Sequence, residues 1–180
     1  MYDILVLAQG MYDQTLNLPE DSKSRTKAAL AWIMKKGVTN QAVLYFAAYK
    51  PPAYPASAPA LSGVMRDAIK DVYPGSVVAL EAPCNFTTKG EVSKFLQVSN
   101  NQPVIVSGSY HLIRIFLYLW EARGLTYARR AIYVTVTRDR INFRQWVTEL
   151  TKIILVILLP EFLQAKLEYW YAKRTHKLVS

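Results

Sequence analysis

The sequence is poor in cysteine, histidine and glycine, and each shortage excludes a class of site. The single cysteine, Cys84, cannot form an internal disulfide, so the fold does not depend on an oxidising compartment. The two histidines, His111 and His176, belong to no cysteine–histidine cluster, and we expect no metal site. The seven glycines form neither G-x-G-x-x-G nor a Walker A loop, and Gly108 does not complete a G-x-S-x-G elbow. A glycine-rich dinucleotide site, a P-loop and an α/β-hydrolase site are therefore disfavoured.

Long hydrophobic runs are also missing. The most strongly apolar run, 153–159, has seven residues, far fewer than the roughly 20 that span a bilayer. The chain enters its first apolar run at Ile4 without a preceding basic region, so it lacks the pattern of a signal peptide. We expect a cytoplasmic protein, or a membrane-associated one if an N-terminal anchor precedes this sequence.

Apolar residues and basic charge are what the sequence has in quantity. At 180 residues and 52% hydrophobic, the chain predicts one domain, 1–180, with a sizeable core. The 22 basic and 13 acidic residues give a net charge of +9. This charge favours a small anionic molecule, nucleic acid or an acidic membrane surface as partner, although an ordinary basic surface would give the same count.

Short apolar runs alternate with helix-length amphipathic segments. The runs are almost continuously apolar, as strands are when a parallel sheet is covered on both faces. The alternation predicts a doubly wound α/β domain with a mostly parallel, five-stranded Rossmann-like sheet and helices on both faces. The predicted strands are 4–8, 42–47, 77–80, 104–107 and 132–136, and the predicted helices are 24–36, 61–72, 88–98 and 110–123.

The first predicted helix and the C-terminal tail each imply a buried face. In 24–36 the apolar spacing directs Ala28, Leu30, Ala31, Ile33 and Met34 toward the core. The core spans 3–137, and a helical extension spans 142–177 with a break at Pro160.

Within the extension, residues 153–159 are apolar all round, so we expect 153–163 to be buried against the body or against a second subunit of a homodimer. The alternative is peripheral membrane contact, because Lys166, Lys173, Trp170 and Tyr171 follow in a mixture that suits an interfacial helix.

Open parallel sheets bind ligands beyond the carboxyl ends of their strands, so the residues that follow each strand are the candidates for a site. His111 and Arg114 share one face in the first turns of a predicted helix. The helix N-terminus there disfavours a protonated imidazole, which leaves His111 as a base or a hydrogen-bond donor. Arg114 can hold a carboxylate or a phosphate. In the alternative reading this pair is a solvated helix face, and the Arg114 side chain is exposed and contributes little to folding.

A second helix start follows the third predicted strand. Thr88 and Glu91 fit a capping box, yet the same helix N-terminus favours an anion, which the hydroxyl of Thr87 or Thr88 could also contact. Arg25, early in the first helix, opposes the helix dipole, so it is either exposed or reaches a ligand or a carboxylate. Cys84 lies close by in the sequence and is interpreted as a small buried residue.

The ordered set of motifs over residues 3–137 resembles the YdcF-like family, which includes the SanA and ElyC envelope proteins. Its marks here are a strand ending near Gly10, the helix segment Arg25-Thr-Lys-Ala-Ala-Leu30, Glu81 before Thr87-Thr88, and a strand followed by His111-x-x-Arg114. The chain departs from the family pattern after the second strand, where Ala47-Ala48-Tyr49-Lys50 replaces a Ser-Gly-Gly-like turn. The resemblance implies a Rossmann-like fold, nucleoside-type ligands such as S-adenosylmethionine, and cell-envelope precursor metabolism.

Two hypotheses follow, and nucleic-acid binding is disfavoured because no motif combines stacking aromatics with basic residues. In the first, Glu81 and His111 are catalytic residues that position or transfer a proton in phosphoester or phosphoanhydride chemistry, and Glu81, Thr88, His111 and Arg114 converge on one cleft. In the second, the protein is a non-catalytic binding or scaffold protein that uses its basic surface and apolar tail at a membrane or a partner. In the first hypothesis the residues that bind the ligand are Gly10, Arg25, Thr87, Thr88, Ser107, Ser109 and Arg114.

Overall fold

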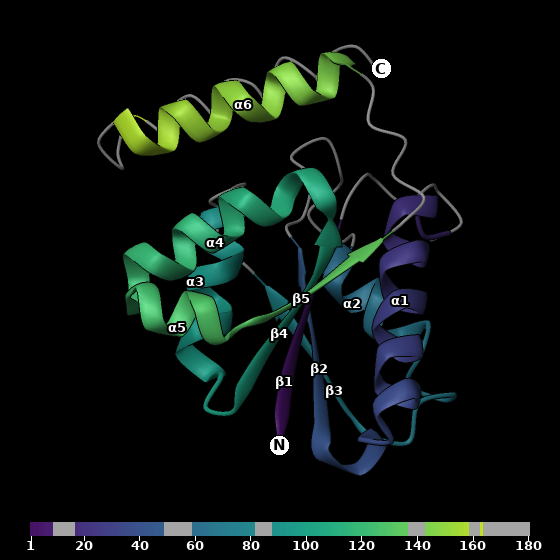
Figure 1. The fold of residues 1–180 in the computed structure, drawn as a ribbon. Coiled ribbons are helices and arrows are strands. Elements are labelled where there is room, and N and C mark those ends of the chain that lie inside the picture. Colours follow the sequence, from purple (N-terminus) through teal and green to yellow (C-terminus); the bar gives the residue numbers. More distant parts are fainter. Residues whose placement is uncertain (9–16, 49–58, 82–87, 137–142, 159–162, 164–180) are drawn as a thin grey trace.

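The computed structural model describes residues 1–8, 17–48, 59–81, 88–136, 143–158 and 163. Its centre is a five-stranded, all-parallel sheet with the strand order β3-β2-β1-β4-β5 (Figure 1). All five predicted strands are confirmed, each within two residues at either end. They are β1 (Tyr2–Leu7), β2 (Ala42–Ala48), β3 (Ser76–Glu81), β4 (Gln102–Gly108) and β5 (Ile132–Val136).

Helices cover both faces of the sheet, as the alternation of strands and helices predicts. The chain moves from β1 to β2 and β3 in one direction and then returns to β4 and β5, and right-handed crossovers place the helices of the two halves on opposite faces. Figure 1 shows α1 and α2 on one face and α3, α4 and α5 on the other. These helices are α1 (Glu20–Lys36), α2 (Leu61–Asp67), α3 (Thr88–Val98), α4 (Ser109–Arg123) and α5 (Leu125–Arg130).

Successive residues of β1 point into two separate hydrophobic cores. Ile4 and Val6 join the core beneath α1 and α2, and Leu5 and Leu7 join the core beneath α3 and α4. All four side chains are 2% exposed or less. A central strand buried on both faces explains why its sequence is a continuous apolar run without a polar alternation.

Helix α1 begins four residues before the predicted start, at Glu20. Pro19 precedes it, Glu20 and Asp21 lie in its first turn, and Gly37 ends it in the left-handed conformation with φ 64°. Acidic residues at a helix N-terminus and glycine just past its end are both favoured positions. The predicted start gave more weight to the serines that follow, whereas the dipole and the proline favour the earlier residue.

The predicted core face of α1 is wrong for two residues. Ala31 is exposed, and Met34 is 76% exposed, whereas Arg25, Ala29 and Ile33 are at most 1% exposed. The apolar spacing alone allowed either face. The buried face is the one that carries Arg25, whose side chain donates a hydrogen bond to the backbone carbonyl of Leu7 at the end of β1.

Two further helices differ from the predictions. α2 ends at Asp67, short of the predicted 72, and the residues after it form turns. The six-residue helix α5, between α4 and β5, was not predicted. It begins after Gly124, whose φ of 86° ends α4, so a glycine in the left-handed region separates the two helices.

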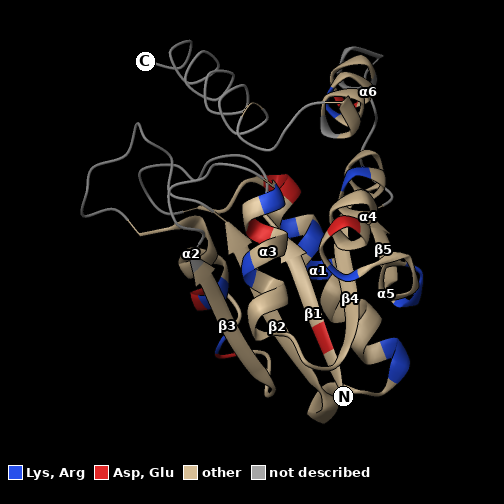
Figure 2. Ribbon diagram, turned by 90° about the vertical axis from the view of Figure 1, so that its left-hand side faces the viewer, with Lys and Arg blue, Asp and Glu red and all other residues tan. Residues whose placement is uncertain are grey.

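Helix α6 (Phe143–Leu158) lies above α4, beyond the carboxyl ends of the strands, and does not cover a face of the sheet (Figures 1 and 2). The expectation that 153–163 is buried against the body is wrong for three of its described residues, whereas Ile153, Leu155 and Leu163 are partly buried. Ile154, Ile157 and Leu158 are 52%, 64% and 71% exposed. The sheet does not need this helix, because α1 to α5 already cover both faces. Whether a second subunit covers it stays a prediction, and no helix among the described residues is long and apolar enough to cross a membrane.

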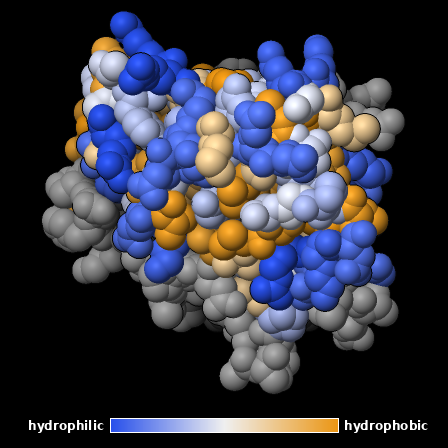
Figure 3. Space-filling view, turned by 90° about the horizontal axis from the view of Figure 1, so that it is seen from below, coloured by the Kyte–Doolittle hydropathy of each residue, from blue (hydrophilic) through white to orange (hydrophobic). Residues whose placement is uncertain are grey.

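A buried carboxylate, that of Asp3 in β1, lies at the amino end of the sheet. Asp3 is 1% exposed and accepts hydrogen bonds from the Ser99 hydroxyl (3.0 Å), the Asn100 and Asn101 amides (2.9 and 2.8 Å) and the Asn101 side chain (3.1 Å). These donors belong to the turn that joins α3 to β4, so the carboxylate ties that turn to β1. Figure 3 views the molecule from this end, where hydrophilic residues surround a few hydrophobic patches.

Candidate anion-binding site

From the strand order, a ligand site is expected at the junction between β1 and β4. The chain order reverses there, and helices from opposite faces begin on either side of the junction. Ligands of doubly wound sheets bind in the crevice beyond the carboxyl ends of strands at such a point. The helices α3 and α4 both begin at this edge, and the first turns of α4 carry His111 and Arg114.

Arg114 is the centre of a buried polar cluster. Its side chain is 3% exposed, so the expectation of an exposed arginine is wrong. One terminal nitrogen, Nη2, donates to His111 Nδ1 at 2.8 Å and to the Thr88 hydroxyl at 3.2 Å. These two acceptors use both hydrogens of that nitrogen and hold the guanidinium in one orientation. The structure therefore brings together three of the four residues expected to converge, namely Thr88, His111 and Arg114.

The arginine also determines the tautomer of His111. A guanidinium only donates, so Nδ1 of the imidazole is an acceptor and the ring proton of neutral His111 resides on Nε2. Burial, followed by the positive charges of Arg114, Arg25 and Lys152, lowers the pKa of His111 well below its ordinary value of 6.5. His111 is thus neutral at physiological pH and presents an N–H donor, which agrees with the expectation for a helix N-terminus.

Arg25 approaches the same junction from the opposite face of the sheet. It is 1% exposed, and its Nη1 donates to the backbone carbonyl of Leu7, the last residue of β1, at 3.0 Å. The alternative of an exposed Arg25 is wrong. The hydrogen bond gives the side chain a structural role, and its charge also acts at the site, because it contributes to the lowered pKa of His111.

Sequence reasoning missed two charged residues, Glu149 and Lys152, which come to the site on α6. Glu149 is 4% exposed. Its Oε1 accepts a hydrogen bond from Lys152 Nζ at 2.9 Å, and its Oε2 lies 3.5 Å from Arg114 Nη2 and 3.8 Å from His111 Nδ1. The sequence feature that could have indicated this residue is that Glu149 is the single acidic residue within 143–158.

The second oxygen of Glu149 is poorly satisfied. Both hydrogens of Arg114 Nη2 already have acceptors, and neutral His111 has no proton on Nδ1, so neither group donates to Glu149 Oε2. No hydrogen-bond donor for this buried oxygen is present among the described residues. Leaving a buried acceptor unmatched costs about 1–3 kcal/mol. The contact between Glu149 and Arg114 is therefore attractive through charge but incomplete in hydrogen bonds.

The two serines of the predicted site have different surroundings. Ser107, near the end of β4, is fully buried, and its hydroxyl has no hydrogen-bond partner in the part of the chain that the structure describes. Ser109 is exposed and is the first residue of α4. A buried hydroxyl without a partner is uncommon in a folded protein and marks a place where a ligand or water can bind.

Other predicted site residues lie apart from this cluster or outside the description. Glu81 is the last residue of β3, the edge strand, which β2 separates from β1. Its side chain is not described, and Gly10, Thr87 and Cys84 also lie outside the described residues. Thr88 is the first residue of α3, so the N-cap position falls on residue 87, outside the description.

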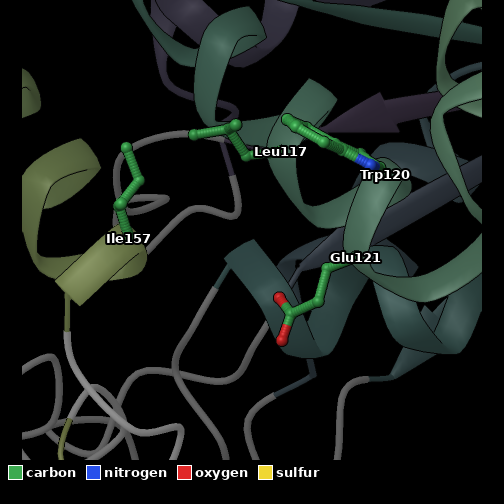
Figure 4. Close-up of a pocket in the computed structure, with 4 residues that line it drawn as sticks. All are labelled: Leu117, Trp120, Glu121 and Ile157. Carbon is green, nitrogen blue, oxygen red and sulfur yellow. The ribbon is translucent and has the colours of Figure 1, made fainter.

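A separate open pocket of about 210 Å³ lies between α4 and α6. Figure 4 shows Leu117, Trp120 and Glu121 from α4 and Ile157 from α6 around it. Its lining is mostly apolar, and it shares no residue with the Arg114 cluster. Among the described residues no group of three or more His, Cys, Asp or Glu side chains could hold a metal ion.

Comparisons with protein-family models, curated proteins and solved structures find no match for this chain. The resemblance to the YdcF-like family stays a prediction that rests on the motifs around Arg25, Glu81, Thr88 and His111-x-x-Arg114.

Proposed function

We propose that the protein binds a small oxyanion, the phosphate of a phosphorylated or nucleoside-type metabolite, at the carboxyl edge of the sheet between β1 and β4. The observation that carries this proposal is the buried Arg114, held in one orientation by Thr88 and His111 beside the starts of α3 and α4. Three cations, Arg25, Arg114 and Lys152, lie close enough to His111 to lower its pKa, and two of them, Arg114 and Lys152, contact the carboxylate of Glu149. Positive charge gathered in a buried region favours an anion.

The neighbouring groups suit a phosphate. Helices α3 and α4 have 11 and 15 residues, and their first backbone N–H groups point toward the carboxyl edge, as in many phosphate sites. The Nε2 proton of His111 is a donor to an anionic oxygen, and the Ser107 hydroxyl is another. The tautomer favours a donor role for His111 over the role of a base, because Arg114 already occupies the lone pair of Nδ1.

The reaction class that we propose is hydrolysis or transfer at a phosphoester or phosphoanhydride. Arg114 would neutralise the charge on the phosphoryl oxygens, and His111 would donate to a developing or bridging oxygen. Glu81 stays the candidate base on the sequence alone, because β3, which it ends, is a neighbour of neither β1 nor β4 in the sheet. By resemblance to the YdcF-like family, the substrate would be a nucleoside-type compound, S-adenosylmethionine included, in cell-envelope precursor metabolism.

Calorimetric titration tests the binding proposal. Inorganic phosphate, adenosine monophosphate and S-adenosylmethionine would each be titrated into the wild type, Arg114→Gln and the control Arg129→Gln. Arg129 is exposed on α5, toward the amino edge of the sheet. Loss of one charge-assisted contact is worth about 1.5–3 kcal/mol, or roughly 10–100-fold in affinity.

Arg114→Gln should therefore lose at least tenfold in affinity for the anion, while Arg129→Gln keeps the wild-type value. Circular dichroism at the titration temperature would establish that the buried substitution leaves the protein folded. Unchanged phosphate affinity in folded Arg114→Gln would contradict the proposal.

A second candidate function is binding of an anionic membrane surface through α6. One face of this helix carries five apolar side chains that are 46–71% exposed: Val147, Leu150, Ile154, Ile157 and Leu158. The net charge of +9 and the basic and aromatic residues after Pro160 complement anionic lipid. Co-flotation with phosphatidylserine vesicles that is lost in Ile154→Asn/Ile157→Asn would support this candidate. A dimer in solution without co-flotation would instead assign the face to a second copy of the chain.

A further inference from the structure

The position of Glu149 has a consequence for how a ligand enters the site, and this step rests on the proposed function. The carboxylate projects from α6 to the guanidinium of Arg114, the group that an oxyanion would contact, and it also accepts a hydrogen bond from Lys152 of the same helix. Carboxylate and phosphate make the same kind of contact with such cations. Glu149 therefore occupies the location where the negative charge of a ligand would be most favourable.

The fit of Glu149 is incomplete, which makes it replaceable. Its Oε2 remains 3.5 Å from Arg114 Nη2, whose hydrogens are directed to Thr88 and His111. A phosphate has more oxygens than a carboxylate and would also accept a hydrogen bond from the Nε2 proton of His111, which Glu149 does not use. A ligand can thus form hydrogen bonds that the internal carboxylate does not.

Helix α6 is packed less closely than the helices that cover the sheet. Neither hydrophobic core includes a side chain from the described part of α6, and five of its apolar side chains are exposed. It packs on α4 over the carboxyl edge of the sheet (Figure 2). Movement of this helix would withdraw Glu149 and Lys152 together and would leave Arg25, His111 and Arg114 in place on α1 and α4.

We propose that Glu149 is an internal competitor for the anion site: its carboxylate closes the site when no ligand is bound, and a phosphate-bearing ligand displaces it together with α6. The protein is thereby autoinhibited for anion binding. The ligand class is an oxyanion with at least three oxygens, since a simple carboxylate would only reproduce the contacts that Glu149 already makes.

The first test compares phosphate affinity in wild type, Glu149→Gln and Asp71→Asn by calorimetry. Glu149→Gln removes the competing charge and keeps the shape, and Asp71→Asn makes the same charge change at an exposed site near the start of β3. We expect Glu149→Gln to bind inorganic phosphate at least tenfold more tightly, with Asp71→Asn unchanged. Wild-type binding that Glu149→Gln leaves equal or weakens would overturn the competitor role while the anion site stands. Absence of binding in all three proteins would remove both proposals.

The second test holds α6 in place. Leu117→Cys and Ile157→Cys, in a Cys84→Ser background, put thiols on α4 and α6 around one pocket, and a bifunctional methanethiosulfonate reagent would bridge them (Figure 4). The bridged protein should lose at least tenfold in phosphate affinity and regain it when a reductant releases the bridge. Equal affinity before and after release would show that α6 need not move and would overturn the displacement step.

Discussion

The two ends of the sheet each bury charged residues, and the two buried clusters differ in how completely they are satisfied. At the amino end, Asp3 accepts four hydrogen bonds from three consecutive residues, 99–101. At the carboxyl end, Arg114 of α4 and Glu149 of α6 contact each other. One carboxylate oxygen of Glu149 and the hydroxyl of Ser107 in β4 lack hydrogen-bond partners among the described residues. A stable fold needs hydrogen-bond partners for its buried polar groups, and the Asp3 carboxylate at the amino end has them.

The difference indicates which cluster is available for function. A closed network such as that of Asp3 contributes rigidity and has no position for another molecule. An open network retains donors and acceptors that a ligand can use, and departures from full satisfaction are expected where a protein binds or reacts. We expect Asp3 to serve stability and, under the proposed function, Arg114 to serve recognition, and four substitutions test this division.

The largest expected effect is at the amino end. Asp3→Ala should lower the free energy of unfolding by about 3 kcal/mol, because it leaves several buried donors without an acceptor. Urea denaturation measures it, with Asp71→Ala as the exposed control, for which we expect a change within about 0.5 kcal/mol. Phosphate affinity should be unchanged in folded Asp3→Ala. A loss of affinity there would break the division between the two ends.

The next effect is pH dependence at the carboxyl end. Because the pKa of His111 is lowered in the folded state below its ordinary 6.5, the unfolded chain takes up a proton there first as the pH falls. The stability associated with neutral His111 is full above pH 6.5 and is lost as the pH falls below it, by up to about 1.4 kcal/mol per pH unit.

Urea denaturation of the wild type and His111→Gln at about pH 7.5 and 5.5 isolates this contribution. The wild type should lose about 1 kcal/mol more than His111→Gln over this interval. Equal losses in the two proteins would mean that His111 ionises as freely in the folded state as in the unfolded chain.

Two buried serines give the last comparison. Ser99→Ala removes a donor to the Asp3 carboxylate and should cost about 1–2 kcal/mol. Ser107→Ala removes a hydroxyl that has no partner in the described part of the chain and should stay within about 0.5 kcal/mol of the wild type. Differential scanning calorimetry resolves the two variants. A cost at Ser107 equal to that at Ser99 would show that the carboxyl end is as closed as the amino end.

The site was only partly predictable because its members come together through tertiary contacts. His111 and Arg114 share a helix face, and that face follows from local spacing. The contact of Arg114 with Thr88 joins residues 26 positions apart, and it could be expected only from the rule that strand ends meet at one edge. Glu149 reaches the cluster through the packing of α6 on α4. The apolar pattern of α6 does not indicate which helix it will contact.

Burial of charge was the most difficult property to predict. Arginine in a helix is usually exposed, yet the side chains of Arg25 and Arg114 are 1% and 3% exposed. Long charged side chains are rarely buried without partners, and those partners, the Leu7 carbonyl, Thr88 and Glu149, lie on other elements. Local patterns record which residues are apolar but not which charges will find partners.

The sequence by itself determined the five parallel strands, four of the five helices between them and the placement of His111 and Arg114 in the first turns after β4. Apolar runs and helical spacing are local properties, and right-handed crossovers convert their order into a fold. Only the tertiary structure decided which face of α1 is buried, that α6 lies above α4 instead of on the sheet, and that Glu149 contacts Arg114. Each of these depends on the balance of charge and packing between segments distant in the chain, which no local pattern contains.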